Sequence, residues 1–263
     1  MSLVHVDSQK CVHCGTCIEV CPIGLLGAEP SGIPCDNPGA ENMCMVCGHC
    51  ISSCPHDALQ ISKNTQKLSP LPKAPFVEAE NVKTFLKSRR SVRQYQNKPI
   101  SKDVFEQILD VTRWAPTAMN GQPVQWVVFQ NKDDVHKIAG VVIEGFRKSQ
   151  MLPAIVQVWD KGKDMVLRGA PHLVLACVPK VAIEHTRGVC IIALTYLELA
   201  AHAQGIGTCW AGMLMLMAEK YPPVLEALQL PSGLALGGAM MLGYPKYKYH
   251  RLPPRKPAQV NWK

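Results

Sequence analysis

Features that would assign this chain to a membrane, a secretory pathway or nucleic acid are missing from its sequence. Residues Met1–Asp7 show no basic stretch followed by an apolar one, so we expect no secretion signal. The longest apolar run, Val189–Ala203, is interrupted by Glu198 and His202 and is too short to span a bilayer. No basic helix or aromatic-studded strand indicates nucleic-acid binding. We therefore expect a cytoplasmic protein with neither a membrane nor a nucleic acid as partner.

Motifs for acid–base or nucleophilic catalysis are also absent. The sequence contains no carboxylate pair, no nucleophilic triad and no motif for a single metal ion. Gly205-Ile206-Gly207 follows a predicted helix rather than a strand and lacks a third glycine, so it does not indicate dinucleotide binding. The sequence therefore identifies no catalytic acid or base.

Acidic and basic side chains are divided unevenly along the chain. Of its 28 Lys and Arg and 20 Asp and Glu, only Lys10 and six acids lie up to Ser62, which leaves 27 basic and 14 acidic side chains beyond it. The basic part predicts a solvated surface with a few anion-binding arginines. The opposite signs favour electrostatic docking of the front segment on the rest.

Cysteine, in contrast, is abundant and repeated. The pattern Cys-x2-Cys-x2-Cys-x3-Cys-Pro covers Cys11–Pro22 and recurs 33 residues later at Cys44–Pro55. A turning backbone that carries a thiolate at every third residue can wrap one corner of an iron–sulfur cube. A zinc site would use a single set of four thiolates at different spacing, and a disulfide framework would need an oxidising compartment. The repeat therefore predicts iron–sulfur ligation in a reducing cytosol.

The repeat resembles that of bacterial-type two-cluster ferredoxins over residues 1–62. In such ferredoxins the fourth cysteine of each pattern ligates the other cluster. The resemblance implies two 4Fe–4S clusters, one held by Cys11, Cys14, Cys17 and Cys54, and the other by Cys44, Cys47, Cys50 and Cys21. This crossing would tie together two halves that are too short to bury a large core.

Four further cysteines lie outside the repeats. Cys177, Cys190 and Cys209 occur in apolar stretches and are expected to be small buried residues. Cys35 lies in the predicted loop between the repeats, as a bystander thiol, a spare ligand or a redox switch.

The composition changes after Ser62. Residues 63–76 are polar, contain Pro70, Pro72 and Pro75 and show no apolar period, which predicts an extended linker. Beyond Val77, apolar periodicity predicts helices over residues 77–90, 101–112, 135–146 and 188–204, and strands over 126–129, 173–178, 208–212 and 234–242. Residues 151–165 fit neither pattern and are consistent with a lid or a subunit arm.

Two polar stretches in this second part leave alternatives open. Arg89-Arg90-Ser91-Val92-Arg93 is either a solvated helix end or an anion clamp, because guanidinium forks and a hydroxyl suit a phosphate. Residues 114–123 include Asn120-Gly121 and form either a plain helix-to-strand connection or a loop whose amide side chain holds the edge of a planar heterocycle.

Together these stretches occur in the order seen in the nitroreductase family of FMN flavoproteins. The ordered groups are Arg89–Arg93, Ala115–Pro123, Gly205–Gly212, Gly243–Pro245 and Arg255–Pro257. The chain resembles this family over residues 77–263. The resemblance implies an α+β fold in which helices flank an antiparallel-dominated sheet, and an intertwined homodimer with FMN at the subunit interface.

The resemblance also implies which residues hold FMN. The phosphate and ribityl chain would be held by Arg89, Arg90, Ser91, Arg93 and Arg255. The flavin ring would be contacted by Pro116, Thr117 and Asn120, supplied by the partner subunit, with Gln122 nearby, and at its other edge by Trp210, Ala211 and Gly212. The family often has an aromatic residue after the Gln-Pro step, where this chain has Val124, so the substrate side of the pocket is left open.

A ferredoxin-like module beside an FMN domain predicts conversion between one- and two-electron chemistry. We expect an oxidoreductase that takes electrons from a ferredoxin-type donor or NAD(P)H and reduces an electrophilic small molecule such as a nitroaromatic or a quinone. Protons would come from water, from the substrate's surroundings or from a hydroxyl such as that of Thr208. Two alternatives remain: an electron-transfer adaptor or redox sensor without small-molecule turnover, and an enzyme that acts on flavin itself.

Overall fold

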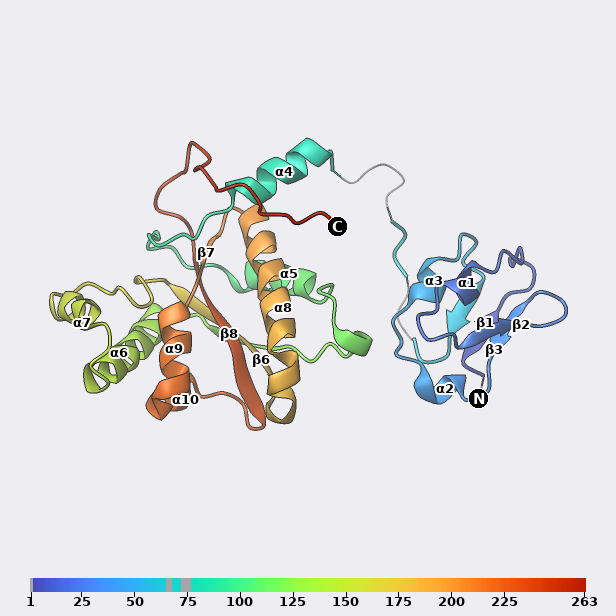
Figure 1. Ribbon diagram of the computed structural model, residues 1–263, viewed down its shortest axis with the longest axis horizontal. Coiled ribbons are helices and arrows are strands. Elements are labelled where there is room, and N and C mark those ends of the chain that lie inside the picture. The colour runs from blue at the N-terminus through green and yellow to red at the C-terminus, as the bar shows by residue number, and fades with distance from the viewer. Residues whose placement is uncertain (1, 65–67, 72–76) are drawn as a thin grey trace. The chain divides into compact units, whose positions relative to one another are not determined.

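A computed structural model describes residues 2–64, 68–71 and 77–263, and Figure 1 shows their helices and strands. These residues form two compact units. The smaller unit contains the described residues up to 71 together with Thr117–Gly121, and the larger unit contains 77–116 and 122–263. Residues 65–67 and 72–76 of the expected linker lie outside the described residues. No helix in the described ranges combines the length and the apolar character needed to cross a bilayer.

The smaller unit uses the same short backbone turn twice. Helix α1 (Thr16–Glu19) follows Gly15, whose φ is 72°, and helix α3 (His49–Ser52) follows Gly48, whose φ is 77°. Both glycines adopt the left-handed conformation that residues with a Cβ rarely adopt. The sequence repeat is therefore also a repeat of backbone conformation.

Short antiparallel strands close the smaller unit. The pairs are β1 (Val4–Val6) with β4 (Leu59–Ile61) and β2 (Leu26–Ala28) with β3 (Pro34–Asp36), and helix α2 (Ala40–Met43) follows β3. Cys35 lies in β3 rather than in a loop. The buried side chains form a small core that includes Leu3, Leu26, Ile51 and Leu59.

The larger unit is built on a four-stranded antiparallel sheet in the order β5-β6-β8-β7. The strands are β5 (Gln125–Phe129), β6 (His172–Pro179), β7 (Gly207–Trp210) and β8 (Leu234–Gly243). The four predicted strands are confirmed, although β7 ends at Trp210 because Gly212 begins helix α9 (Gly212–Lys220). The predicted α+β fold with helices around an antiparallel sheet is therefore confirmed.

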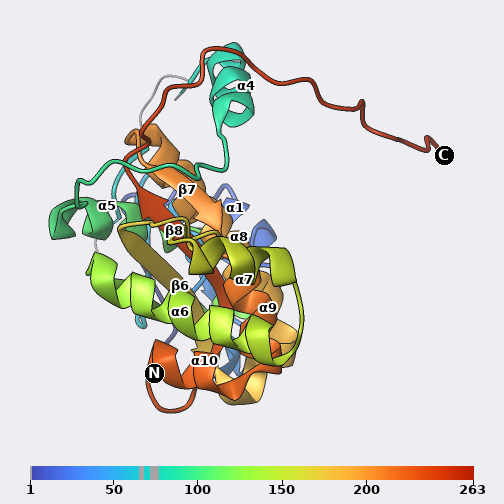
Figure 2. The same ribbon diagram turned by 90° about the vertical axis from the view of Figure 1, so that its left-hand side faces the viewer.

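Helices cover both faces of this sheet, so β6 is apolar from Leu173 onwards. Leu173 and Leu175 point to the layer of α6 (Lys132–Lys148), α7 (Pro153–Asp160), α9 and α10 (Pro222–Leu228), and Figure 2 looks onto that layer. Val174 and Ala176 point to the opposite layer, formed by α5 (Lys102–Thr112) and α8 (Ile183–Ala203). Alternate residues of one strand therefore belong to two cores, which explains a continuous apolar run in place of an alternating one.

Two glycines allow α8 to approach the sheet closely. A Cβ added to Gly237 would overlap Cys190 Sγ, and one added to Gly238 would lie 2.5 Å from Leu194 Cδ1. Cys177, Cys190 and Cys209 are all buried, as expected.

Some apolar side chains that were expected to be covered are exposed in the single chain. Helix α4 (Ala79–Ser88) has no buried residue, and Val82 and Leu86 on its apolar side are 39% and 49% exposed. In α8, which packs on the sheet, Ile191 is 46% exposed.

Residues 151–165, for which a lid or a subunit arm stays a prediction, are helical in part. They contain helix α7, which begins with Pro153 at its first position, where proline suits a helix because no intrahelical N–H is needed. Val156 is buried in the core, and the Trp159 ring stacks on His136 with centroids 4.8 Å apart. Part of this segment therefore packs into the core of the larger unit.

Candidate functional site

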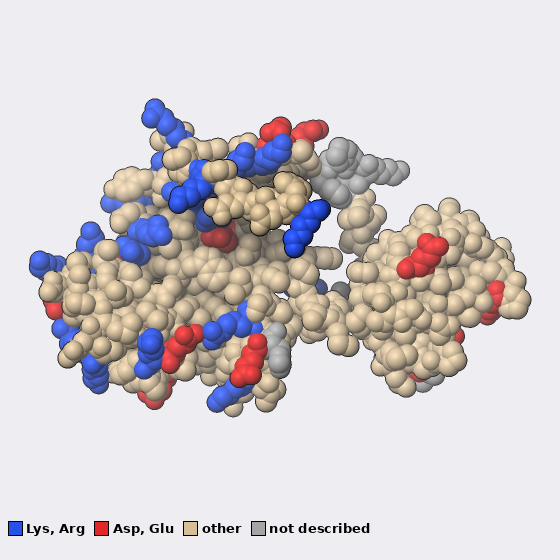
Figure 3. All heavy atoms as spheres, viewed as in Figure 1, with Lys and Arg blue, Asp and Glu red and all other residues tan. Residues whose placement is uncertain are grey.

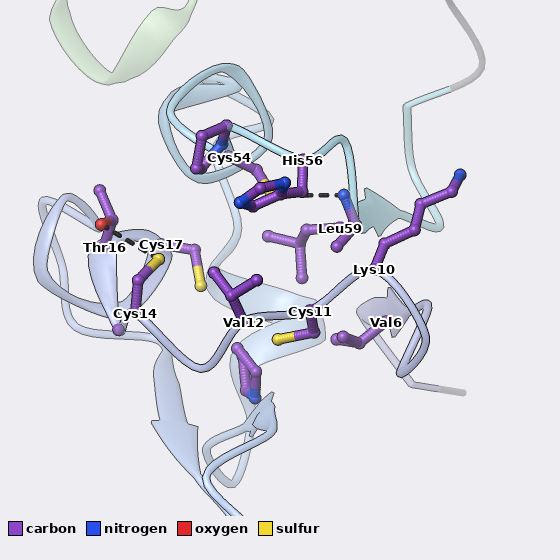
Figure 4. A pocket seen from close by; sticks show the side chains of 14 residues that line it. Val6, Lys10, Cys11, Val12, Cys14, Thr16, Cys17, Cys54, His56 and Leu59 are labelled. Atoms are coloured by element: carbon purple, nitrogen blue, oxygen red, sulfur yellow. Dashed lines mark hydrogen bonds between the residues drawn. The ribbon is translucent and has the colours of Figure 1, made fainter.

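Four cysteine side chains line one cavity in the smaller unit, which Figure 4 shows from close by. They are Cys11, Cys14 and Cys17 of the first repeat and Cys54 of the second. Burial raises the pKa of the Cys17 thiol, and the nearby Cys14 and Cys54 thiolates raise it further. The backbone N–H of Ala58 donates a hydrogen bond to Cys54 Sγ at 3.2 Å.

The other four cysteines of the repeats line a second cavity. They are Cys44, Cys47 and Cys50 of the second repeat and Cys21 of the first. Burial raises the pKa of Cys50 to about 11, and the Cys47 and Cys21 thiolates also raise it. The backbone N–H of Leu25 donates to Cys21 Sγ at 3.3 Å, which matches the bond at Cys54 in the first cavity.

Both cavities have the chemistry of an iron–sulfur site. Four thiolates repel one another, and burial opposes their ionisation, so such a set needs cations among its members. In the ranges that the structure describes, no three His, Cys, Asp or Glu side chains converge closely enough to hold a single metal ion. The thiols instead line each cavity in sets of four. This arrangement suits a cluster of several irons bound at its corners.

In the larger unit, the arginine-rich stretch lies alongside β7. Ser91 forms a parallel bridge with Thr208, and the backbone N–H of Val92 donates to the Thr208 carbonyl at 2.8 Å. Tyr95 forms an antiparallel bridge with Pro245. The structure therefore brings together three of the sequence motifs, those at residues 89–93, 205–212 and 243–245.

A buried carboxylate lies under this stretch. Arg89 Nη1 is 2.9 Å from Glu198 Oε1, and Thr208 Oγ1 donates to the same oxygen at 3.0 Å. Sequence reasoning treated Glu198 only as an interruption of an apolar run. Thr208 is 2% exposed, and its hydroxyl donates its hydrogen to Glu198.

A further arginine, missed in the sequence, lies near the same strand. Burial raises the pKa of the Cys209 thiol, and the charges of Arg93 and Arg168 oppose this rise. The same two guanidinium groups oppose the effect of burial on the pKa of Tyr95. Arg168 has a left-handed backbone with φ of 61° just before β6. The only sequence signal for it was an Arg-Gly step ahead of a strand.

Of the remaining predicted phosphate ligands, Arg90 is half-buried and Arg255 is exposed. The Arg90 guanidinium lies 5.6 Å from the centre of the Tyr249 ring, in the segment that follows β8. Arg255 lies further along this exposed segment. On the face shown in Figure 3, Lys and Arg side chains are spread over the larger unit.

The predicted ring-contacting residues fall into two groups. Pro116 and Gln122 belong to the larger unit, whereas Thr117 and Asn120 belong to the smaller one. There Asn120 Nδ2 donates to the backbone carbonyls of Met45 and Val46 at 3.3 and 3.1 Å. Asn120 has a left-handed φ of 53°, which asparagine tolerates better than most residues.

The third predicted group lies where β7 meets α9. Trp210 ends the strand, and the backbone N–H of Ala211 donates to the Ala239 carbonyl at 3.0 Å. A Cβ added to Gly212 would meet no atom within 4 Å, so the space beside this backbone is open. These residues fit a flavin phosphate because Arg93 and Arg168 carry positive charges. They fit a flavin ring because the space beside the Gly212 backbone is open.

Comparisons with known proteins agree with both units. The model of the nitroreductase family matches residues 86–244, and a model described as a 4Fe-4S binding domain matches residues 3–26. A "Putative NADH dehydrogenase/NAD(P)H nitroreductase" of Archaeoglobus fulgidus is 30% identical over 159 residues, which cover 60% of this chain and 82% of that protein. The 5,6-dimethylbenzimidazole synthase of Rhodospirillum rubrum is 26% identical over 182 residues, covering 63% and 82% of the two chains.

Solved structures show the same fold for the larger unit. A nitroreductase with bound FMN from Desulfitobacterium hafniense aligns with a TM-score of 0.58 at 20% identity, covering 71% of this chain and 99% of that one. The family model spans more than half of the chain. The chain therefore belongs to the nitroreductase family of oxidoreductases and carries a 4Fe–4S binding domain ahead of its nitroreductase domain.

Proposed function

We propose that the chain is an FMN-dependent oxidoreductase in which two 4Fe–4S clusters exchange electrons with FMN to reduce an electrophilic small molecule, such as a nitroaromatic or a quinone. The observation that carries this proposal is the pair of thiol-lined cavities in a chain that also contains a nitroreductase domain. When bound, FMN would supply chemistry that accepts one or two electrons, and each cluster would carry one electron at a time.

In this proposal the eight repeat cysteines hold the clusters as crossed sets. Cys11, Cys14, Cys17 and Cys54 hold one, and Cys44, Cys47, Cys50 and Cys21 hold the other. The domain boundaries that go with it are residues 1–62 for the iron–sulfur domain, 63–76 for the linker and 77–263 for the flavin domain.

The arginine-rich stretch would bind the FMN phosphate and ribityl chain. The residues proposed for this role are Arg89, Arg90, Ser91, Arg93 and Arg255. Support comes from the fixed position of Ser91 beside Thr208 and from the two positive charges of Arg93 and Arg168 near β7. Arg89 has one nitrogen on Glu198, so it would act with its remaining N–H groups.

The flavin ring would rest on the backbone of Trp210, Ala211 and Gly212. Pro116, Thr117, Asn120 and Gln122 would approach from a second copy of the chain in a homodimer. The exposed apolar sides of α4 and α8 support such a dimer, because a second copy would remove Val82, Leu86 and Ile191 from water.

Two electron donors are consistent with this assembly. A ferredoxin-type protein would reduce the clusters, and NAD(P)H would reduce the flavin, as the name of the Archaeoglobus fulgidus relative suggests. Anaerobic titration of the purified protein with each donor separates the two routes. We expect at least one donor to bleach the flavin absorbance and a nitroaromatic or quinone to restore it. A flavin that neither donor reduces would contradict the proposal.

A second candidate function is supported by the Rhodospirillum rubrum relative, whose name describes the synthesis of dimethylbenzimidazole. In that case flavin itself would be consumed as substrate. The test is the flavin content during aerobic turnover. Loss of flavin in proportion to turnover would favour this function, and constant flavin content would exclude it.

A further inference from the structure

The two repeats differ at one position that faces a cluster ligand. Thr16 is the first residue of α1, and His49 is the first residue of α3 at the matching place in the second repeat. Thr16 Oγ1 donates a hydrogen bond to Cys14 Sγ at 3.4 Å, as Figure 4 shows. His49 is exposed and cannot offer the same short hydroxyl to Cys47.

The linings of the two cavities differ in the same direction. Thr16, Lys10 and His56 line the first cavity beside its cysteines. The second cavity is lined by its cysteines and otherwise by apolar residues and glycine: Leu3, Val4, Pro22, Ile23, Leu25, Leu26, Met45, Gly48 and Ile61. Both linings are mainly apolar, and only the first includes polar side chains beside its cysteines.

Lys10 adds a positive charge beside the first cavity, and a neighbouring carboxylate weakens its effect. Its Nζ lies 3.5 Å from Asp7 Oδ2, and both side chains are about half exposed. Solvent and this partner weaken the charge, so the hydroxyl of Thr16 is the more direct difference between the sites.

Backbone N–H donors offset only part of the difference between the two cavities. Ala58 N–H on Cys54 and Leu25 N–H on Cys21, at 3.2 and 3.3 Å, supply one similar bond to each cavity. The second cavity also has Val46 N–H on Cys44, at 3.5 Å the longest of these contacts. Against it stands the Thr16 hydroxyl, which donates to Cys14 Sγ at 3.4 Å.

Reduction adds negative charge to a cluster and its thiolates. A hydrogen-bond donor or a positive charge therefore stabilises the reduced form more than the oxidised form and raises the reduction potential. An apolar lining disfavours the added charge and lowers the potential.

Resting on the proposed pair of clusters, we propose that the cluster held by Cys11, Cys14, Cys17 and Cys54 has the higher reduction potential of the two, and that Thr16 is a positioning residue that sets the difference through Cys14. An electron that enters the domain then settles on the first cluster, and the second cluster is reduced last.

The test is an anaerobic redox titration of the loaded full-length protein, followed by electron paramagnetic resonance. Iron and sulfide are counted first, and about eight irons per chain are expected for two clusters. Wild type is compared with Thr16→Val, which removes the hydroxyl, Thr16→Ser, which keeps it, and His49→Thr, which adds a hydroxyl to the second repeat.

We expect two reduction steps in wild type. Thr16→Val lowers the midpoint potential of the upper step only. The expected change is about tenfold in the equilibrium constant for reduction, or about 59 mV for a one-electron couple. Thr16→Ser restores the wild-type value, and His49→Thr raises the lower step. His49→Thr tests the effect of a hydroxyl at this position even if Thr16→Val does not bind its clusters.

Two results would overturn the inference while leaving two clusters in place. One is a single midpoint shared by both clusters with eight irons present, and the other is an upper step that Thr16→Val leaves unchanged. A count of about four irons would instead refute the proposed pair of clusters, and this inference with it.

Discussion

Arg89 and Glu198 form an ion pair in the larger unit, with Arg89 Nη1 2.9 Å from Glu198 Oε1. The Glu198 side chain is 9% exposed and that of Arg89 is 24% exposed. A buried carboxylate is stable only when paired and hydrogen-bonded, and Thr208 supplies the second bond. The pair therefore fixes the arginine-rich stretch to α8.

Replacing Glu198 tests the importance of this pair. Glu198→Gln keeps the shape and an acceptor oxygen but removes the charge, and should lower the free energy of unfolding by about 1.5 kcal/mol, because hydrogen bonds between charged groups are the strong ones. The matched control is Glu219→Gln, whose pair with Arg187 is half exposed at both ends and should matter by no more than about 0.5 kcal/mol. Urea unfolding followed by tryptophan fluorescence is suitable, since all five tryptophans lie in the larger unit. Equal losses in the two variants would contradict this role for Glu198.

Gly237 provides a test of the close packing between α8 and β8. Gly237→Ala should destabilise the larger unit by about 1–3 kcal/mol, because the added methyl overlaps Cys190 and the packed core must shift. Gly188→Ala in α8, where an added Cβ meets nothing within 4 Å, should stabilise by about 0.5–1 kcal/mol through helix propensity. Thermal or urea unfolding measures both. A neutral Gly237→Ala would mean that the helix and the sheet are further apart than described.

Most of the fold was predictable from the sequence because its signals are local. Strand β6 is a continuous apolar run, and α6 has a clear apolar period, so both were predicted close to their observed bounds. Helix α7 was missed because eight residues give too few turns to show a period. Helix α10, which starts at Pro222, was missed for the same reason.

The candidate sites show a similar division. The cysteine sets were predictable because the repeat resembles that of two-cluster ferredoxins, in which the fourth cysteine of each pattern ligates the other cluster. Glu198 and Arg168 were not, because their roles depend on neighbours far away in the chain: Glu198 pairs with Arg89, and Arg168 acts on Cys209. Sequence periodicity carries no record of such long-range charge contacts.

Iron content in double variants tests the crossing of the cysteine sets. Cys11→Ala with Cys54→Ala removes two ligands of one proposed cluster, so about four irons per chain should remain. Cys11→Ala with Cys21→Ala removes one ligand from each cluster and should leave fewer, although both cysteines belong to the same repeat. Iron and sulfide analysis of the purified variants gives the answer. If the second variant kept about four irons and the first kept none, each repeat would hold its own cluster.

Stability of the larger unit should depend on pH through His172. This side chain is 1% exposed, its Nε2 accepts the Ile100 N–H at 2.8 Å, and burial lowers its pKa. The unfolded chain therefore binds a proton at His172 more readily than the folded chain does. The stability that neutral His172 contributes is complete above about pH 6.5 and is lost as the pH falls towards the pKa of His172 in the folded chain. Urea unfolding between about pH 5.5 and 8 should show the loss in wild type.

The variant His172→Gln serves as control for that dependence. The variant should be less stable than wild type at pH 8, but its free energy of unfolding should fall less steeply as the pH falls. The fall that remains would come from His202, whose pKa is lowered by burial and by the charge of Arg89. An unchanged slope in the variant would assign the pH dependence to other groups.

The proposal as a whole depends on electron transfer between the iron–sulfur domain and the flavin. The most direct measurement is rapid anaerobic mixing of the loaded protein with a reduced ferredoxin, with cluster and flavin absorbance followed separately. We predict that the flavin of wild type is reduced after the clusters, and that the flavin of the Cys11→Ala, Cys21→Ala variant stays oxidised. Clusters that become fully reduced while the wild-type flavin remains oxidised would contradict the account.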